Sequence, residues 1–173
     1  MGKFISRKPL FTCIQTLLVL LILGTGSTAQ SPEKISGYIE CNGIPYYYEI
    51  HGKGDPILLL HGGLGSLDMF QPILSMIKEN RQVILVDLHG HGRTILGERD
   101  LRINDMADDV AKLLTTLEYK KVDVLGYSLG AGVVLRMTIQ HPELLARVAL
   151  VSCTFSFPRS WPSNPWPMRR QLK

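Results

Sequence analysis

The chain has 173 residues, 45% of them hydrophobic and 20% charged, with 16 glycines, 10 prolines and 3 cysteines. This balance is ordinary for one globular domain, and it excludes collagen-like, low-complexity and disulfide-rich proteins. The formal net charge of +4 includes three basic and no acidic residues within positions 1–29, so the rest of the chain carries only +1 and nucleic-acid binding is not expected.

The first 29 residues are predicted to be a signal peptide. Three basic residues precede an apolar run at 14–23, and small residues follow as far as Ala29. This order is typical of secretory leaders, so the mature protein is expected to start at Gln30 and to be exported. The alternative is an uncleaved membrane anchor, although the apolar run is shorter than the roughly 20 residues that span a bilayer.

The body of the chain alternates strand and helix patterns. Residues 35–50 predict an antiparallel hairpin, because the Asn42-Gly43 step favours a tight turn with positive φ. Beyond the hairpin, the alternation indicates a parallel sheet with flanking helices. Further strands are expected at 56–60, 83–87, from 121 and at 147–152, with helices at 67–78, at 103–117 and after Ser128 as far as His141.

The helix at 103–117 carries apolar residues at helical spacing, which indicates packing against the core. Asp105, Asp108 and Asp109 lie near its start, where carboxylates complement the helix dipole. We expect these three side chains to be solvated and to have no catalytic role.

The most informative motif is the G-x-S-x-G pattern at 126–130, where a strand passes directly into a helix. So sharp a turn leaves no room for side chains beside the serine, and Gly126 and Gly130 are expected where a Cβ would clash. Ser128 is therefore a candidate nucleophile. Its Oγ is expected near the first turn of the helix, whose free N–H groups and positive dipole end stabilise negative charge.

Two other strands also end in loops that combine glycines with polar residues. The strand at 56–60 leads into His61-Gly62-Gly63-Leu64-Gly65, and the strand at 83–87 leads into the loop at 88–94. In an open parallel sheet, sites form at the carboxyl ends of the strands. Both loops and Ser128 are therefore expected to line one edge of the sheet.

With these three motifs in this order, the chain resembles the α/β-hydrolase family, in its esterase, haloperoxidase and carbon-carbon hydrolase branch, from about Ile35 to Val151. The resemblance implies an α/β class protein with the N-terminal part of a three-layer α/β/α fold, in which an antiparallel hairpin precedes parallel strands with flanking helices. It also implies that the backbone N–H groups of Leu129 and Gly63 form an oxyanion hole, although the choice among the neighbouring glycine-loop amides stays open.

Within the second loop, the resemblance implies that Asp87 braces the backbone and does no chemistry. Family members commonly have an arginine where this chain has His89. We therefore expect the internal pairing of this loop to differ from the family pattern.

The chief departure from the family concerns the catalytic triad, whose members follow in the order serine, acid, histidine. The chain has no histidine after His141, and only six of the family's usual eight strands are found. Residues 30–157 are therefore interpreted as a partial α/β-hydrolase domain without the strands that bring the acid and the base. Because loss of the base costs about four to six orders of magnitude in other triads, the chain is expected to be nearly inactive.

His89 and His91 are the upstream candidates for a base, but they are interpreted as loop residues beside tight turns. Together with Asp87 they could also offer alternate ligands to zinc. A hydrolytic zinc site needs three protein ligands and an open position, and Gly90 and Gly92 suit a turning loop better than an extended strand. No metal and no cofactor are expected.

Residues 158–173 are rich in proline, tryptophan and arginine, a composition that excludes a regular core element. We interpret this tail as the start of a truncated cap domain or as the product of a frameshift. The alternative is an interfacial membrane segment, since tryptophan rings are favoured at the level of lipid headgroups.

The sequence thus predicts an exported serine hydrolase that acts on a carboxylic ester or related acyl compound through an acyl-enzyme. A serine at the elbow argues against the epoxide hydrolase and haloalkane dehalogenase branches, which use a carboxylate. The expected partner is a small ester-like substrate, with no nucleic acid and no stable membrane span after leader cleavage, and the oligomeric state stays open. The alternatives are a non-catalytic remnant or small-molecule-binding module of the same fold, and complementation of the missing strands by another chain.

Overall fold

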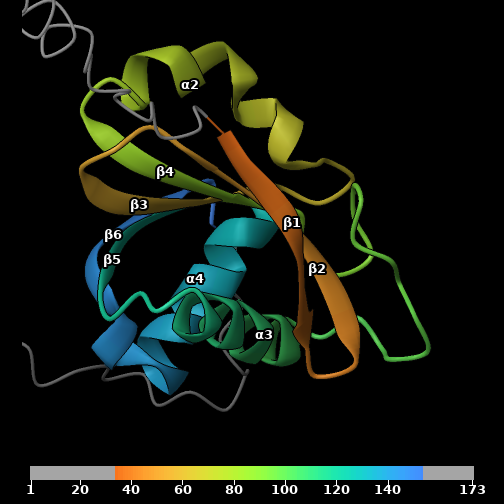
Figure 1. The fold of residues 1–173 in the computed structure, drawn as a ribbon. Coiled ribbons are helices and arrows are strands. Elements are labelled where there is room, and N and C mark those ends of the chain that lie inside the picture. Colours follow the sequence, from red (N-terminus) through yellow and green to blue (C-terminus); the bar gives the residue numbers. More distant parts are fainter. Residues whose placement is uncertain (1–33, 154–173) are drawn as a thin grey trace, which may run out of the picture. The chain divides into compact units, whose positions relative to one another are not determined.

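The computed structural model describes residues 34–153, which form a six-stranded mixed sheet with helices on both faces (Figure 1). The predicted signal peptide at 1–29 and the predicted tail at 158–173 lie outside the described residues. Among the residues that are described, no helix combines the length and the apolar character needed to cross a membrane.

The sheet has the strand order β1-β2-β4-β3-β5-β6. β1 pairs with β2, and β2 with β4, in the antiparallel sense, whereas the β4–β3, β3–β5 and β5–β6 pairs are parallel. This arrangement confirms the predicted hairpin followed by a parallel sheet. The strands are β1 (Lys34–Cys41), β2 (Ile44–His51), β3 (Asp55–Leu60), β4 (Arg81–Val86), β5 (Val122–Tyr127) and β6 (Leu145–Val151).

The turn of the hairpin has the backbone that its sequence predicts. Asn42 has φ 51° and Gly43 has φ 90°, so both central residues lie at positive φ. Two positive φ values match the twist of the flanking strands, and they bring Cys41 opposite Ile44.

Helices cover the sheet from two sides (Figure 1). α2 lies on one face, while α3 and α4 lie on the other. The predicted helix at 67–78 is a 3₁₀ turn followed by an α-helix, because Pro72 has no N–H to donate and is accommodated in the first turn of the α-helix. The helical segments are η1 (Leu67–Phe70), α2 (Gln71–Ile77), α3 (Ile103–Thr116), α4 (Leu129–Gln140) and η2 (Pro142–Leu144).

The central strands β3 and β4 bury side chains on both faces. Leu58 and Leu60 pack in the cluster that includes α3 and α4, whereas Leu59 packs against residues of η1 and α2. β4 alternates in the same way, with Ile84 on the first side and Leu85 on the second. The continuous apolar runs in the sequence are therefore explained by a sheet that is covered on both sides.

The prediction that Asp109 is solvated is wrong, since this residue of α3 is fully buried. Its carboxylate accepts hydrogen bonds from Asn42 Nδ2 (2.8 Å), Tyr46 OH (2.8 Å) and the guanidinium of Arg99. The hairpin folds over α3 and supplies two of these donors from more than sixty positions away, a contact that helical spacing alone does not reveal. Burial, together with the Asp109 charge, also raises the pKa of Tyr46.

Candidate active site

Three loops meet at the edge of the sheet where β3, β4 and β5 end. These strands are adjacent and parallel, so their carboxyl ends lie side by side. The N–H of Gly130 donates to the carbonyl of His61 (3.0 Å), and the N–H of Leu88 donates to His61 Nε2 (3.0 Å). Both hydrogen bonds confirm the prediction that the three loops line one edge.

Ser128 occupies the turn between β5 and α4 with an unusual backbone. Its φ of 50° and ψ of −108° lie outside the regions that non-glycine residues commonly adopt. The N–H of Ser128 donates to Val151 O on β6 (2.9 Å), and its carbonyl accepts from the N–H of Gly132 (3.1 Å). Because such a backbone costs about 1–3 kcal/mol, it persists only where surrounding contacts hold it, and it is a common feature of functional sites.

The two glycines of the motif are required by close backbone approach. A Cβ on Gly126 would lie 2.5 Å from the carbonyl oxygen of Gly130. A Cβ on Gly130 would collide with the carbonyl of Leu60 at the end of β3. Neither obstacle is a flexible side-chain end, so α4 can follow β5 this closely only with glycine at both positions.

The glycine loop after β3 lies directly against the Ser128 turn. A Cβ on Gly62 would lie 3.4 Å from Ser128 Cβ, and a Cβ on Gly63 would lie 3.9 Å from Leu129 Cβ. Within the described residues, the backbone hydrogen bonds do not use the N–H of Gly63 or that of Leu129. Two donors are thus available beside Ser128, and Leu129 starts α4, where the helix dipole favours negative charge.

His61 is a structural residue of this edge. Its Nε2 accepts from the N–H of Leu88, so the proton lies on Nδ1, which donates to Gly62 O (2.7 Å). The ring is fully buried, and burial lowers the pKa of His61. A neutral imidazole with both nitrogens engaged joins the loops after β3 and β4, and it has no free nitrogen for proton transfer.

Asp87 is fully buried and holds the loop after β4 to the segment after the glycine loop. One carboxylate oxygen accepts from the N–H of Leu67 (2.7 Å), and the other accepts from the N–H (2.8 Å) and Nη1 (3.3 Å) of Arg93. The Arg93 guanidinium also pairs with Asp68 and lies 5.0 Å from the centre of the Tyr47 ring. Sequence reasoning missed this role of Arg93, although its place six residues after Asp87 within one glycine-rich loop is the signal that could have indicated it.

The hydrogen-bond partners of His89 and His91 do not support a role as general base. His89 is fully buried, its Nε2 donates to Leu96 O (2.5 Å), and its Nδ1 has no partner within the described residues. His91 Nδ1 lies 2.8 Å from His89 O, and its ring centre lies 5.4 Å from that of His61. Neither side chain hydrogen-bonds to Ser128.

The remaining histidines lie elsewhere. His51 Nε2 contacts Glu49 (2.8 Å), and His141 Nε2 contacts Asp108 (2.7 Å). Within residues 34–153, therefore, no histidine is hydrogen-bonded to Ser128. Over the same residues, no group of three or more histidine, cysteine, aspartate or glutamate side chains is arranged to hold a metal ion.

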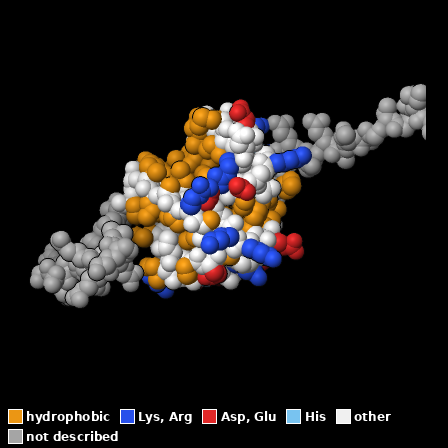
Figure 2. All heavy atoms as spheres, turned by 90° about the vertical axis from the view of Figure 1, so that its left-hand side faces the viewer, with side chains coloured by type: hydrophobic (Ala, Val, Ile, Leu, Met, Phe, Trp, Pro, Cys, Tyr) orange, Lys and Arg blue, Asp and Glu red, His pale blue; other side chains and the backbone are white. Residues whose placement is uncertain are grey.

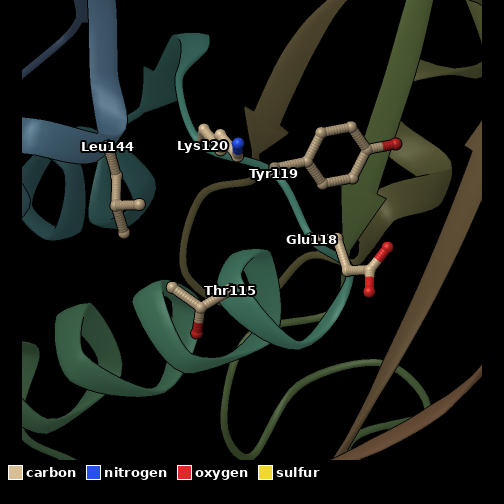
Figure 3. Close-up of a pocket in the computed structure, with 5 residues that line it drawn as sticks. All are labelled: Thr115, Glu118, Tyr119, Lys120 and Leu144. Atoms are coloured by element: carbon tan, nitrogen blue, oxygen red, sulfur yellow. The ribbon is translucent and has the colours of Figure 1, made fainter.

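A pocket of about 690 Å³ lies far from this edge (Figure 3). It is formed at the end of α3 and the start of β5, which is the amino end of the parallel strands. On the same side, Asp123 accepts hydrogen bonds from Arg147 and Arg81, which lower its pKa to about 2. The pocket is lined by Thr115, Glu118, Tyr119, Lys120 and Leu144.

Comparison with known proteins finds hydrolases. Residues 55–171 match the family model described as the alpha/beta hydrolase fold. The uncharacterized hydrolase YraK of Bacillus subtilis is 33% identical over 110 residues, which make up 62% of this chain and 41% of that protein. The 2-(acetamidomethylene)succinate hydrolase of Mesorhizobium japonicum is 29% identical over 120 residues, or 69% of this chain and 43% of that protein.

A solved structure with the same arrangement is the epoxide hydrolase CorEH. It is similar with a TM-score of 0.64 and 28% identity, over 73% of this chain and 47% of CorEH. The chain therefore spans less than half the length of each of these three proteins.

Proposed function

Since the chain belongs to the alpha/beta hydrolase fold family, we propose that it is a serine-dependent hydrolase of carboxylic esters or related acyl compounds. The observation that carries the proposal is the backbone of Ser128, which has φ 50° at a strand-to-helix turn and lies beside two N–H groups that have no acceptor among residues 34–153. An exposed hydroxyl can attack a carbonyl carbon, and the adjacent N–H groups can stabilise the oxyanion that forms.

In the proposed reaction, Ser128 Oγ attacks the carbonyl carbon of the substrate, and its proton passes to a general base. The N–H groups of Leu129 and Gly63 donate to the oxyanion of the tetrahedral intermediate. Collapse of that intermediate releases the alcohol or amine and leaves an acyl-enzyme, which water then hydrolyses.

None of the described histidines hydrogen-bonds to Ser128, so the described residues do not supply a histidine base. A chain that offers only the described residues is expected to turn over about four to six orders of magnitude more slowly than a complete triad. The same observation favours the second candidate function, a non-catalytic module that binds small molecules at this edge. For either function, we still predict that residues 1–29 are a signal peptide and that the protein is exported.

The choice of an acyl substrate has two supports. One relative is named as a hydrolase of 2-(acetamidomethylene)succinate, a compound with an acyl–nitrogen bond. The elbow residue is a serine, and serine forms acyl-enzymes, whereas the epoxide hydrolase branch is associated with a carboxylate at this position. Similarity to CorEH therefore supports the shared fold, and the elbow residue favours esters over epoxides.

A fluorophosphonate probe tests the proposed nucleophile, because only an activated serine is phosphonylated quickly. We expect Ser128 to be labelled faster than Ser66, although far more slowly than a serine in a complete triad, and the Ser128→Ala variant to lose this label; peptide mass spectrometry identifies the labelled site. Ser66, which is also in this edge of the molecule but caps η1 through its hydroxyl, serves as the internal control. Labelling of other serines at the same slow rate as Ser128 would support the binding module and contradict the hydrolase.

A further inference from the structure

Four large apolar side chains around the Ser128 turn are exposed to solvent. They come from the glycine loop after β3, from the segment between β4 and α3, and from the first residue of α3. We call them the apolar rim. Its members are Leu64 (103% exposed), Leu96 (52%), Leu101 (51%) and Ile103 (43%).

Contacts place the rim beside the candidate active site. A Cβ on Gly90 would lie 3.1 Å from side-chain carbons of both Leu96 and Leu101, so both side chains lie against the loop after β4. Ile103 Cδ1 would lie 3.5 Å from a Cβ on Gly132, whose N–H donates to Ser128 O. The rim thus reaches the first turn of α4.

Leu64 approaches the same place from the other loop. It follows Gly63, which lies against the Leu129 side chain. Its φ is 60°, a left-handed conformation that is unfavourable for a residue with a Cβ, and its side chain contacts little of the protein. Within the described residues, neither backbone preference nor packing explains a leucine between Gly63 and Gly65.

Basic side chains near the rim are already paired. Arg93 binds Asp68 and Asp87, and Arg99 binds the buried Asp109. Arg102 is the most exposed of these three arginines, and it pairs with Asp100 on the surface, where solvent screens the pair. The described part of this edge therefore offers apolar surface in preference to cationic groups.

We propose that the apolar rim binds the hydrophobic chain of the acyl group, so that the substrates are esters of uncharged acids with several methylenes. This inference rests on the proposed function, since it assigns the acyl side of the same serine. Burial of each methylene strengthens binding about fourfold, so a four-methylene extension that is half buried should give at least about a tenfold preference.

The first test compares phosphonofluoridates that carry an ethyl or a hexyl chain on phosphorus. In labelling, a bond forms between Ser128 Oγ and phosphorus, the phosphorus–fluorine bond breaks, fluoride leaves and the hydroxyl proton passes to solvent. We expect the hexyl reagent to react at least about tenfold faster. Leu101→Ser and Ile103→Ser should lower this ratio. The matched control Ile139→Ser changes an exposed apolar residue near the end of α4 and should leave the ratio unchanged.

A second test removes the nucleophile, so that binding is measured apart from reactivity. Calorimetry on the Ser128→Ala variant should find that ethyl hexanoate binds at least about tenfold more tightly than ethyl acetate. If the two esters bound equally well, or if the ethyl and hexyl reagents labelled a reactive Ser128 at the same rate, the rim would not bind the acyl chain. Ser128 could still be the nucleophile. Labelling of Ser128 no faster than that of Ser66 with both reagents, combined with chain-length-dependent binding, would overturn the hydrolase and support the rim in a binding module.

The competing possibility is that the acyl group carries a negative charge, which Arg102 would bind. A reagent with the hexyl length and a terminal carboxylate should react more slowly than the hexyl reagent, because the rim offers it no free partner. If it reacts faster, and if Arg102→Gln abolishes that advantage, the substrate is an acidic acyl compound and the apolar inference is wrong.

Discussion

At the scale of single residues, Ser128 and His61 have opposite characters. Ser128 lies at a strained turn beside N–H groups that find no acceptor in the described part of the chain, whereas His61 is neutral, buried and bonded through both ring nitrogens. Polarity alone does not separate a chemical role from a structural one. Hydrogen-bond partners do, because a side chain with every donor and acceptor engaged has nothing left to offer a substrate.

If the backbone of Ser128 is strained, relieving that strain should raise the free energy of unfolding. Replacement by glycine removes the Cβ that makes φ 50° unfavourable, and this gain exceeds the extra entropy of glycine in the unfolded chain. We expect Ser128→Gly to raise the free energy of unfolding by about 1 kcal/mol and Ser128→Ala to leave it nearly unchanged, as measured by urea denaturation. If glycine gave no gain over alanine, the strain would be absent.

At the scale of elements, the packing of α4 against β3 and β5 positions the candidate nucleophile. The start of α4 approaches the end of β3 so closely that the N–H of Gly130 bonds to His61 O, and no side chain fits between the two backbones. One turn further on there is room again, since a Cβ on Gly132 would meet only Ile103 Cδ1 at 3.5 Å.

This difference predicts opposite effects for two alanine substitutions in one helix. Gly130→Ala places its Cβ on the carbonyl of Leu60, and we expect a loss of about 3 kcal/mol or more, with little folded protein. Gly132→Ala meets an ordinary van der Waals distance and gains helix propensity, so stability should rise by about 0.5–1 kcal/mol. Similar denaturation midpoints for the two variants would contradict the close packing of α4 on β3.

At the scale of the whole described domain, β6 is one of the two border strands of the sheet, opposite β1. It pairs only with β5 within the described residues, and Val148, Leu150 and Val151 are about two-fifths exposed. Figure 2 looks onto the side of the molecule that carries β5 and β6, and it shows hydrophobic surface between basic and acidic side chains. Since Val151 O holds the N–H of Ser128, this exposed strand also supports the candidate nucleophile.

An exposed apolar edge strand predicts self-association. The double variant Val148→Lys with Leu150→Lys places two charges on one face of β6, and we expect a larger fraction of monomer by size-exclusion chromatography with light scattering. Met76→Lys, on an exposed position of α2, is the matched control and should have little effect. An unchanged or smaller monomer fraction in the double variant would show that β6 is not the surface that associates.

Local signals in the sequence determined the hairpin, the order of strands and helices, and the serine motif. Asn42-Gly43 encodes its turn through the φ values that these two residues tolerate, and the apolar runs encode strands covered on both faces. The glycines around Ser128 encode a close approach of backbone to backbone. Each of these signals depends on residues that are neighbours in sequence, so the resemblance to the family and its fold could be predicted.

Only the tertiary structure decided which polar groups were free. It buried Asp109 beneath the hairpin, engaged both nitrogens of His61, paired Arg93 with Asp87, and left an apolar rim exposed around Ser128. The physical reason is that burial and hydrogen bonding are set by partners that lie up to 67 positions away in the chain. A side chain's type is written in the sequence, whereas its availability for chemistry depends on what the fold brings against it.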